Sequence, residues 1–150
     1  MKSVAGDPAH LPMSVGTPQF LPVLAGLIFD SQGRILLARR RPELSNGGKW
    51  EFPGGKLLPD ETPEACLARE IEEELGLAIE VLRPFAVVNH RLEGLNLLLL
   101  AYLCRVRGGR MKLTDHDRVL WLKPPAVLEL PLSEADVPIA EKLAREPISL

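Results

Sequence analysis

The sequence predicts an α/β domain with one mixed sheet flanked by helices. The chain has 150 residues, which is the length of one typical domain. Its composition, 46% hydrophobic and 25% charged, is close to that of an average globular protein. Short apolar runs typical of strands come first, one strongly helical segment interrupts them, and a second helical segment lies near the end of the chain. This order of strands, helix, strands and helix favours a single mixed sheet.

The first strands are expected to follow an irregular N-terminal segment. Residues 1–19 contain three prolines and two glycines without sustained periodicity, which predicts a flexible or extended segment ahead of a domain at 20–150. Val23–Phe29 and Arg34–Ala38 are mostly apolar and are separated by a short polar stretch, which predicts two strands joined by a turn. A short strand is expected at Trp50–Phe52, followed by a glycine loop.

The segment Thr62–Leu75 predicts the central helix. Thr62 is a favourable N-cap residue, Pro63 suits the first helical position, and Glu64 places negative charge in the first turn. Gly76 suits the position at which a helix ends.

The second half of the chain predicts three strands and a last helix. Leu77–Val88 and Leu95–Val106 are largely apolar, and the polar segment 89–94 between them predicts a connecting loop. Val119–Leu122 predicts a further short strand. Ala135–Arg145 has apolar residues at helical spacing and predicts a terminal helix.

Composition excludes several classes of function. With 18 basic and 20 acidic residues the formal charge is −2, so the chain lacks the basic excess that a polymeric nucleic acid would require. The longest apolar run, Leu95–Leu103, is too short for a membrane-spanning helix, and no secretory signal is recognisable. Two cysteines are too few for a disulfide scaffold. A cytoplasmic protein is therefore expected.

Three glutamates of the central helix predict a metal site. At 3.6 residues per turn Glu70, Glu73 and Glu74 fall within about 100° of one another, beside a separate apolar stripe. Such carboxylates repel one another unless a cation lies between them. Their hard oxygen ligands suit Mg²⁺ or Mn²⁺, which commonly also bind substrate phosphates. The alternative is a solvated acidic face that Arg69 partly neutralises.

The surrounding residues resemble the motif of the Nudix hydrolases. The matching positions are Gly55, Glu61, Arg69–Ile71, Glu73–Glu74 and Gly76–Leu77. The resemblance implies an α/β/α sandwich with a loop-helix-loop motif that cleaves a nucleoside diphosphate linked to another group. It also implies roles for five side chains and one carbonyl: Glu70, Glu73, Glu74 and the Gly54 carbonyl as metal ligands, and Arg69 and Glu61 as residues that orient the motif. Glu70 is also the better candidate to deprotonate the attacking water.

Two further segments are similar to the MutT group of nucleoside triphosphate pyrophosphohydrolases, namely 50–56 and 131–138. This similarity implies a reaction that gives a nucleoside monophosphate and pyrophosphate, with Arg40 on the base side and Asp136 reading the base edge. Lys56 is a candidate phosphate ligand. Asp115 occupies a position where relatives usually carry a glutamate metal ligand. The shorter aspartate is a candidate metal ligand through water, and the alternative is an ordinary loop carboxylate. Asp136 has an alternative role as the N-cap of the last helix.

The preferred substrate follows from what Asp136 can bind. An ionised carboxylate only accepts hydrogen bonds, so it favours a base edge rich in donors. We therefore expect a small-molecule nucleotide: 8-oxo-dGTP first, with CTP or 5-methyl-dCTP as the alternative. A nucleotide-sugar hydrolase and a nucleotide-binding module without catalysis are the remaining hypotheses.

Other reactive residue types are assigned structural roles. The three histidines are too scattered for a zinc site, and each, His116 included, is expected at the surface or in the hairpin. Cys66 and Cys104 are expected to be small apolar residues, and Trp50 and Phe52 to be core residues.

Overall fold

A seven-stranded sheet organises residues 19–150, the part of the chain that this computed structural model describes. Residues 1–18 lie outside the described residues, and Gln19, the last residue of the expected N-terminal segment, already belongs to the first strand. Five strands are neighbours in the order β3-β2-β1-β6-β5, while β4 pairs with β1 and β7 with β2. The strands are β1 Gln19–Phe29, β2 Ile35–Arg40, β3 Trp50–Glu51, β4 Gly54–Lys56, β5 Leu77–Leu92, β6 Leu95–Gly109 and β7 His116–Leu122.

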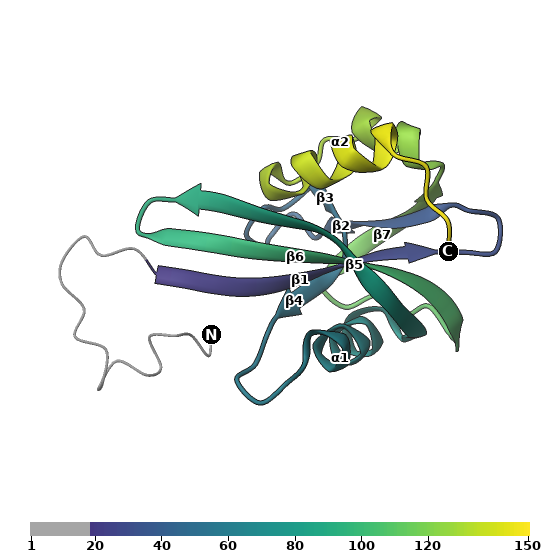
Figure 1. The fold of residues 1–150 in the computed structure, drawn as a ribbon, viewed down its shortest axis with the longest axis horizontal. Helices are drawn as coiled ribbons and strands as arrows, with labels where there is room; N and C mark the ends of the chain where they lie inside the picture. Colours follow the sequence, from purple (N-terminus) through teal and green to yellow (C-terminus); the bar gives the residue numbers. More distant parts are fainter. Residues whose placement is uncertain (1–18) are drawn as a thin grey trace.

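The sheet is mixed because its central pair is parallel. β1 pairs with β6 in parallel along all 11 residues of β1, whereas β1–β2, β1–β4, β2–β3, β2–β7 and β5–β6 are antiparallel. Helix α1 (Pro63–Leu75) covers one face of the sheet, and α2 (Val137–Arg145) covers the other with the short helices η3 (Pro124–Glu129) and η4 (Glu134–Asp136) (Figure 1). The expected α/β/α sandwich is therefore confirmed.

Two apolar cores lie between these layers, because successive side chains of a strand point to opposite faces. On β1, Leu24 and Ile28 pack in the core that contains Leu67 of α1. Leu27 lies in the other core, with Ile139 of α2. The predicted core residues Trp50 and Phe52 are each 4% exposed, and Cys66 and Cys104 are buried as expected.

The ends of α1 follow from its flanking residues, as predicted. The Thr62 hydroxyl accepts a hydrogen bond from the Ala65 N–H at 3.1 Å, and Pro63 begins the helix. Gly76 ends it in a left-handed conformation with φ of 71°, which glycine adopts without steric cost. No helix in the described part of the chain is long and apolar enough to span a membrane.

Several boundaries differ from those predicted, among them those of the second hairpin, the glycine loop and the last strand. The β5–β6 hairpin extends through the expected loop to Leu92, because Gly94 with φ of 74° permits a tight turn. The expected glycine loop contains β4, whose Gly54 approaches β1 so closely that a Cβ there would lie 1.9 Å from the Leu24 carbonyl oxygen. The last strand begins three residues early, at His116.

Candidate active site

One cavity of about 590 Å³ collects most of the predicted site residues. Its walls come from strands β1, β2, β3, β4 and β6, from α1 and η4, and from the loops that follow β2 and precede β7. Seven of the ten predicted residues line it: Arg40, Gly54, Lys56, Glu70, Glu74, Asp115 and Asp136. The other three, Glu61, Arg69 and Glu73, are not among the lining residues and form a cluster on and before α1.

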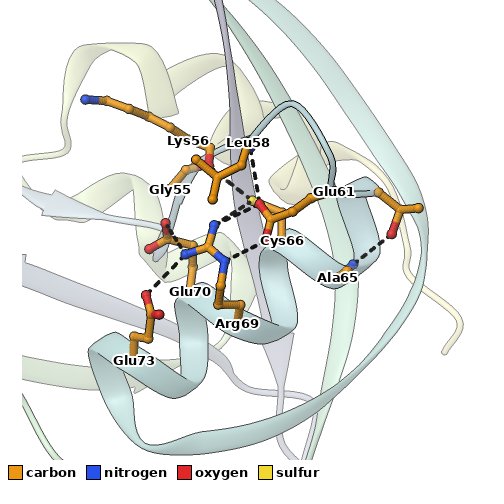
Figure 2. Close-up of polar contacts among 10 residues, drawn as sticks. Gly55, Lys56, Leu58, Glu61, Ala65, Cys66, Arg69, Glu70 and Glu73 are labelled. Carbon is orange, nitrogen blue, oxygen red and sulfur yellow. Dashed lines mark hydrogen bonds and ion pairs between the residues drawn. The ribbon is translucent and has the colours of Figure 1, made fainter. Parts of the chain in front are cut away.

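Arg69 is the centre of that cluster (Figure 2). Its guanidinium donates two hydrogen bonds to Glu61, from Nε at 2.5 Å and from Nη2 at 2.8 Å. Nη1 donates to Glu70 and to Glu73, at 3.2 Å in each case. Glu61 also accepts from the Leu58 N–H at 3.2 Å, so the loop after β4 is attached to α1 through this pair. The hydrogen bonds from Arg69 lower the pKa of Glu61 to about 2, and those to Glu61 raise the pKa of Arg69.

Glu70 and Glu74 lie next to each other at the cavity wall. Burial raises the pKa of Glu70, because the opposing charge of Arg69 does not offset the loss of water. Burial, followed by the charge of Glu70, raises the pKa of Glu74 to about 9. Gly55 leaves the necessary space, since a Cβ there would lie 2.3 Å from the Glu70 carboxyl carbon. The site therefore contains two carboxyl groups that are costly to ionise without a cation.

The donor set at this end of the cavity fits a hard divalent cation. Oε1 of Glu74 is buried and has no hydrogen-bond partner among residues 19–150. A cation would provide that partner and would offset the repulsion between the carboxylates. Within the same residues, however, no three His, Cys, Asp or Glu side chains are arranged around one metal position. Glu73 accepts a hydrogen bond from Arg69, and its side chain is 60% exposed.

Asp136 also lines the cavity and is 5% exposed. Asp136 occupies the N-cap position of α2, in agreement with the alternative, but its carboxyl group makes no capping hydrogen bond and instead accepts one from the Phe52 N–H at 3.2 Å. Burial, followed by the charge of Glu51, raises the pKa of Asp136 to about 8. Near neutral pH it is therefore a carboxylic acid, which offers one donor as well as an acceptor. Burial therefore disfavours the ionised form on which the expected base preference was argued.

The cavity also contains residues that the sequence analysis did not select, above all Glu51. Glu51 lies 2.8 Å from His116 and 3.5 Å from Arg40. The expected exposure of His116 is wrong: it is fully buried, because β7 begins at this residue and pairs with β2. The alternation of Trp50, Glu51 and Phe52 could have indicated this role. Because successive side chains of a strand point to opposite faces, Glu51 must face away from the core in which the two aromatic residues lie.

Comparison with known proteins gives a consistent set of relatives. Residues 20–143 match the family described as NUDIX domain. The chain is 34% identical to the CTP pyrophosphohydrolase of Escherichia coli over 82% of its length and 90% of that relative. It is 41% identical to the 8-oxo-dGTP diphosphatase of Proteus vulgaris over 47% of its length and 62% of that relative. The crystal structure of the MutT protein from Methanosarcina mazei aligns with a TM-score of 0.77 and 28% identity, over 88% of this chain and 97% of that chain.

Proposed function

The chain belongs to the NUDIX domain family, as a MutT-like hydrolase of phosphoric anhydride bonds, and we propose that it converts a nucleoside triphosphate into a nucleoside monophosphate and pyrophosphate. One observation carries the proposal: a single cavity is lined both by the paired carboxyl groups of Glu70 and Glu74 and by buried Asp136. Its volume, about 590 Å³, is suited to a small ligand such as a nucleotide. We assign residues 19–150 to the catalytic domain, one residue more than the expected 20–150, because Gln19 begins β1.

Divalent metal ions are general to the family, and Mg²⁺ is proposed here. Glu70, Glu74 and the Gly54 carbonyl would hold it, joined by Glu73 after its release from Arg69 and by Asp115 through water. When bound, it would neutralise charge on the phosphates and on the departing pyrophosphate.

The protein side chains have distinct proposed tasks. Glu70 accepts the proton of the attacking water. Arg69 and Glu61 keep the loop after β4 fixed to α1, so that Gly54 and Glu70 keep their relative positions. Lys56 binds a phosphate group.

Asp136 and Arg40 are proposed to bind the base. As a carboxylic acid, Asp136 matches an edge that pairs a donor with an acceptor. The guanine edge of 8-oxo-dGTP has this pattern, and we propose this nucleotide as the preferred substrate. CTP is the second candidate, because its base presents an amino donor beside a ring acceptor and the E. coli CTP pyrophosphohydrolase matches this chain over most of its length.

The test is a comparison of kcat/KM values. We expect 8-oxo-dGTP to be hydrolysed faster than dGTP, CTP, dCTP, 5-methyl-dCTP and ADP-ribose at equal protein concentration. A higher value for CTP or 5-methyl-dCTP would assign the enzyme to cytosine nucleotides. A higher value for ADP-ribose would contradict a triphosphate substrate.

A further inference from the structure

His116 is a fully buried polar residue with no task in the proposed reaction. Its Nε2 lies 2.8 Å from the Glu51 carboxylate, while Nδ1 has no partner among residues 19–150. Because a carboxylate accepts hydrogen bonds, Nε2 is the nitrogen that carries the proton. Buried polar side chains are usually hydrogen-bonded, and the contact with Glu51 is the one polar contact of this imidazole among residues 19–150. We therefore attribute the position of His116 to this contact.

The contact continues from Glu51 to Arg40. Nη1 of Arg40 lies 3.5 Å from the same Oε2 atom of Glu51 that His116 contacts, and Nε of Arg40 donates to the Ser45 carbonyl at 2.9 Å. Three strands bring these residues together: Ala38 of β2 is opposite Glu51 of β3, and Arg40 of β2 is opposite His116 of β7. The register of β2 against β7 shifts between Arg39 and Arg40.

The neighbouring arginines are held elsewhere. Arg39 forms a two-point ion pair with Asp117, and Arg41 donates to the Thr114 carbonyl. Neither lines the cavity, whereas Arg40 does. Among these three arginines, the one that contacts Glu51 is therefore Arg40, which lines the proposed nucleotide site.

We propose that His116 is a positioning residue that acts through Glu51 to hold the Arg40 guanidinium toward the bound nucleotide. This inference rests on the proposed function, in which Arg40 contacts the base side of a nucleoside triphosphate. An arginine side chain loses considerable rotamer entropy when it is immobilised. If Glu51 already restrains it, less of that cost falls on nucleotide binding. The His116 N–H in turn fixes the Glu51 carboxylate in the orientation that meets Arg40.

A double-mutant cycle tests the proposal. We expect His116→Phe to raise KM for the nucleotide about tenfold, as for a lost hydrogen bond to a charged group, with kcat changed less than about twofold. His116→Gln, which keeps an N–H near the position of Nε2, should restore most of the affinity. In an Arg40→Ala background His116→Phe should leave KM nearly unchanged, because its effect passes through Arg40. Arg34→Ala, which removes a distant surface ion pair with Asp30, is the matched control and should leave KM unchanged.

Two measurements keep the test informative if the buried site tolerates substitution poorly. Thermal unfolding identifies variants that do not fold, and Glu51→Gln tests the same contact from a side chain that is 20% exposed. An equal rise in KM with and without Arg40 would overturn the positioning role, as would a fall in kcat at constant KM. If the wild-type protein hydrolyses no triphosphate, the proposed function itself is contradicted. If the wild type is active and both His116→Phe and Glu51→Gln keep the wild-type KM, only the positioning role of His116 is contradicted.

Discussion

Arg69 joins Glu61 through two hydrogen bonds, at 2.5 and 2.8 Å, across the boundary between a loop and a helix. The planar guanidinium can donate both bonds at once, which a lysine ammonium cannot do with the same geometry. The same Arg69 also contacts Glu70, so the pair fixes the loop and the proposed base together.

Replacement of Arg69 by lysine tests this relationship. We expect Arg69→Lys to lower kcat/KM about tenfold, because the two-point contact with Glu61 is lost while the charge remains. Steady-state kinetics measure the effect. Arg34→Lys alters an arginine–aspartate pair far from the cavity and should have no effect; an equal loss in both variants would contradict a specific role for Arg69.

Removal of the Glu70 charge tests its role in proton transfer. Glu70→Gln keeps the size of the side chain but cannot accept the proton of the attacking water, so kcat should fall at least about a hundredfold with little change in KM. Glu72→Gln, on the exposed side of the same helix, is the control. Unchanged turnover in Glu70→Gln would remove Glu70 from the mechanism.

A methyl group at Gly55 should displace the Glu70 carboxyl group. In Gly55→Ala the new Cβ would lie 2.3 Å from the Glu70 carboxyl carbon, so this end of the Glu70 side chain must shift. We expect kcat to fall about tenfold or more, as for other small displacements at an active site. Gly108→Ala places its Cβ in open space and should be active; similar kinetics in the two variants would show that the Glu70 position is not critical.

The raised pKa of Asp136 predicts how stability changes with pH. In the unfolded chain this carboxyl group ionises near its ordinary value of 3.8, whereas in the folded protein it ionises near 8. Between these values the folded state binds the additional proton, so the free energy of unfolding falls as pH rises from about 4 to about 8. Asp136→Asn removes this contribution while its amide oxygen still accepts from the Phe52 N–H.

Urea unfolding across this range gives the check. The stability of Asp136→Asn relative to wild type should increase from pH 4 to pH 8, over about the interval between the two pKa values. A constant difference between the two proteins would mean that Asp136 ionises normally in the folded state.

What could be predicted from the sequence was mostly local. The cap at Thr62, the proline after it and Gly76 determine where α1 begins and ends, so the spacing along that helix placed Glu70 and Glu74 correctly on one side. Tertiary contacts decided the rest. Glu51 and His116 are 65 residues apart, and only the pairing of β3 and β7 with β2 brings them together.

The same distinction between local and tertiary contacts applies to the charged residues of the site. Helical geometry puts Glu73 near Glu70, but hydrogen bonding to Arg69 leaves it exposed. From its sequence alone, Asp136 was expected to be ionised like an ordinary aspartate. The burial that raises its pKa depends on tertiary packing, which brings its carboxyl group to the Phe52 N–H. The change from carboxylate to carboxylic acid alters which base edge this residue matches.

Product analysis tests the central claim most directly. After incubation of the protein with 8-oxo-dGTP or CTP and Mg²⁺, we expect nucleoside monophosphate and pyrophosphate in equal amounts, and no turnover when EDTA removes the metal ion. Release of orthophosphate without pyrophosphate, or an unchanged rate in EDTA, would contradict the assignment of this cavity as the site of a metal-dependent nucleoside triphosphate pyrophosphohydrolase.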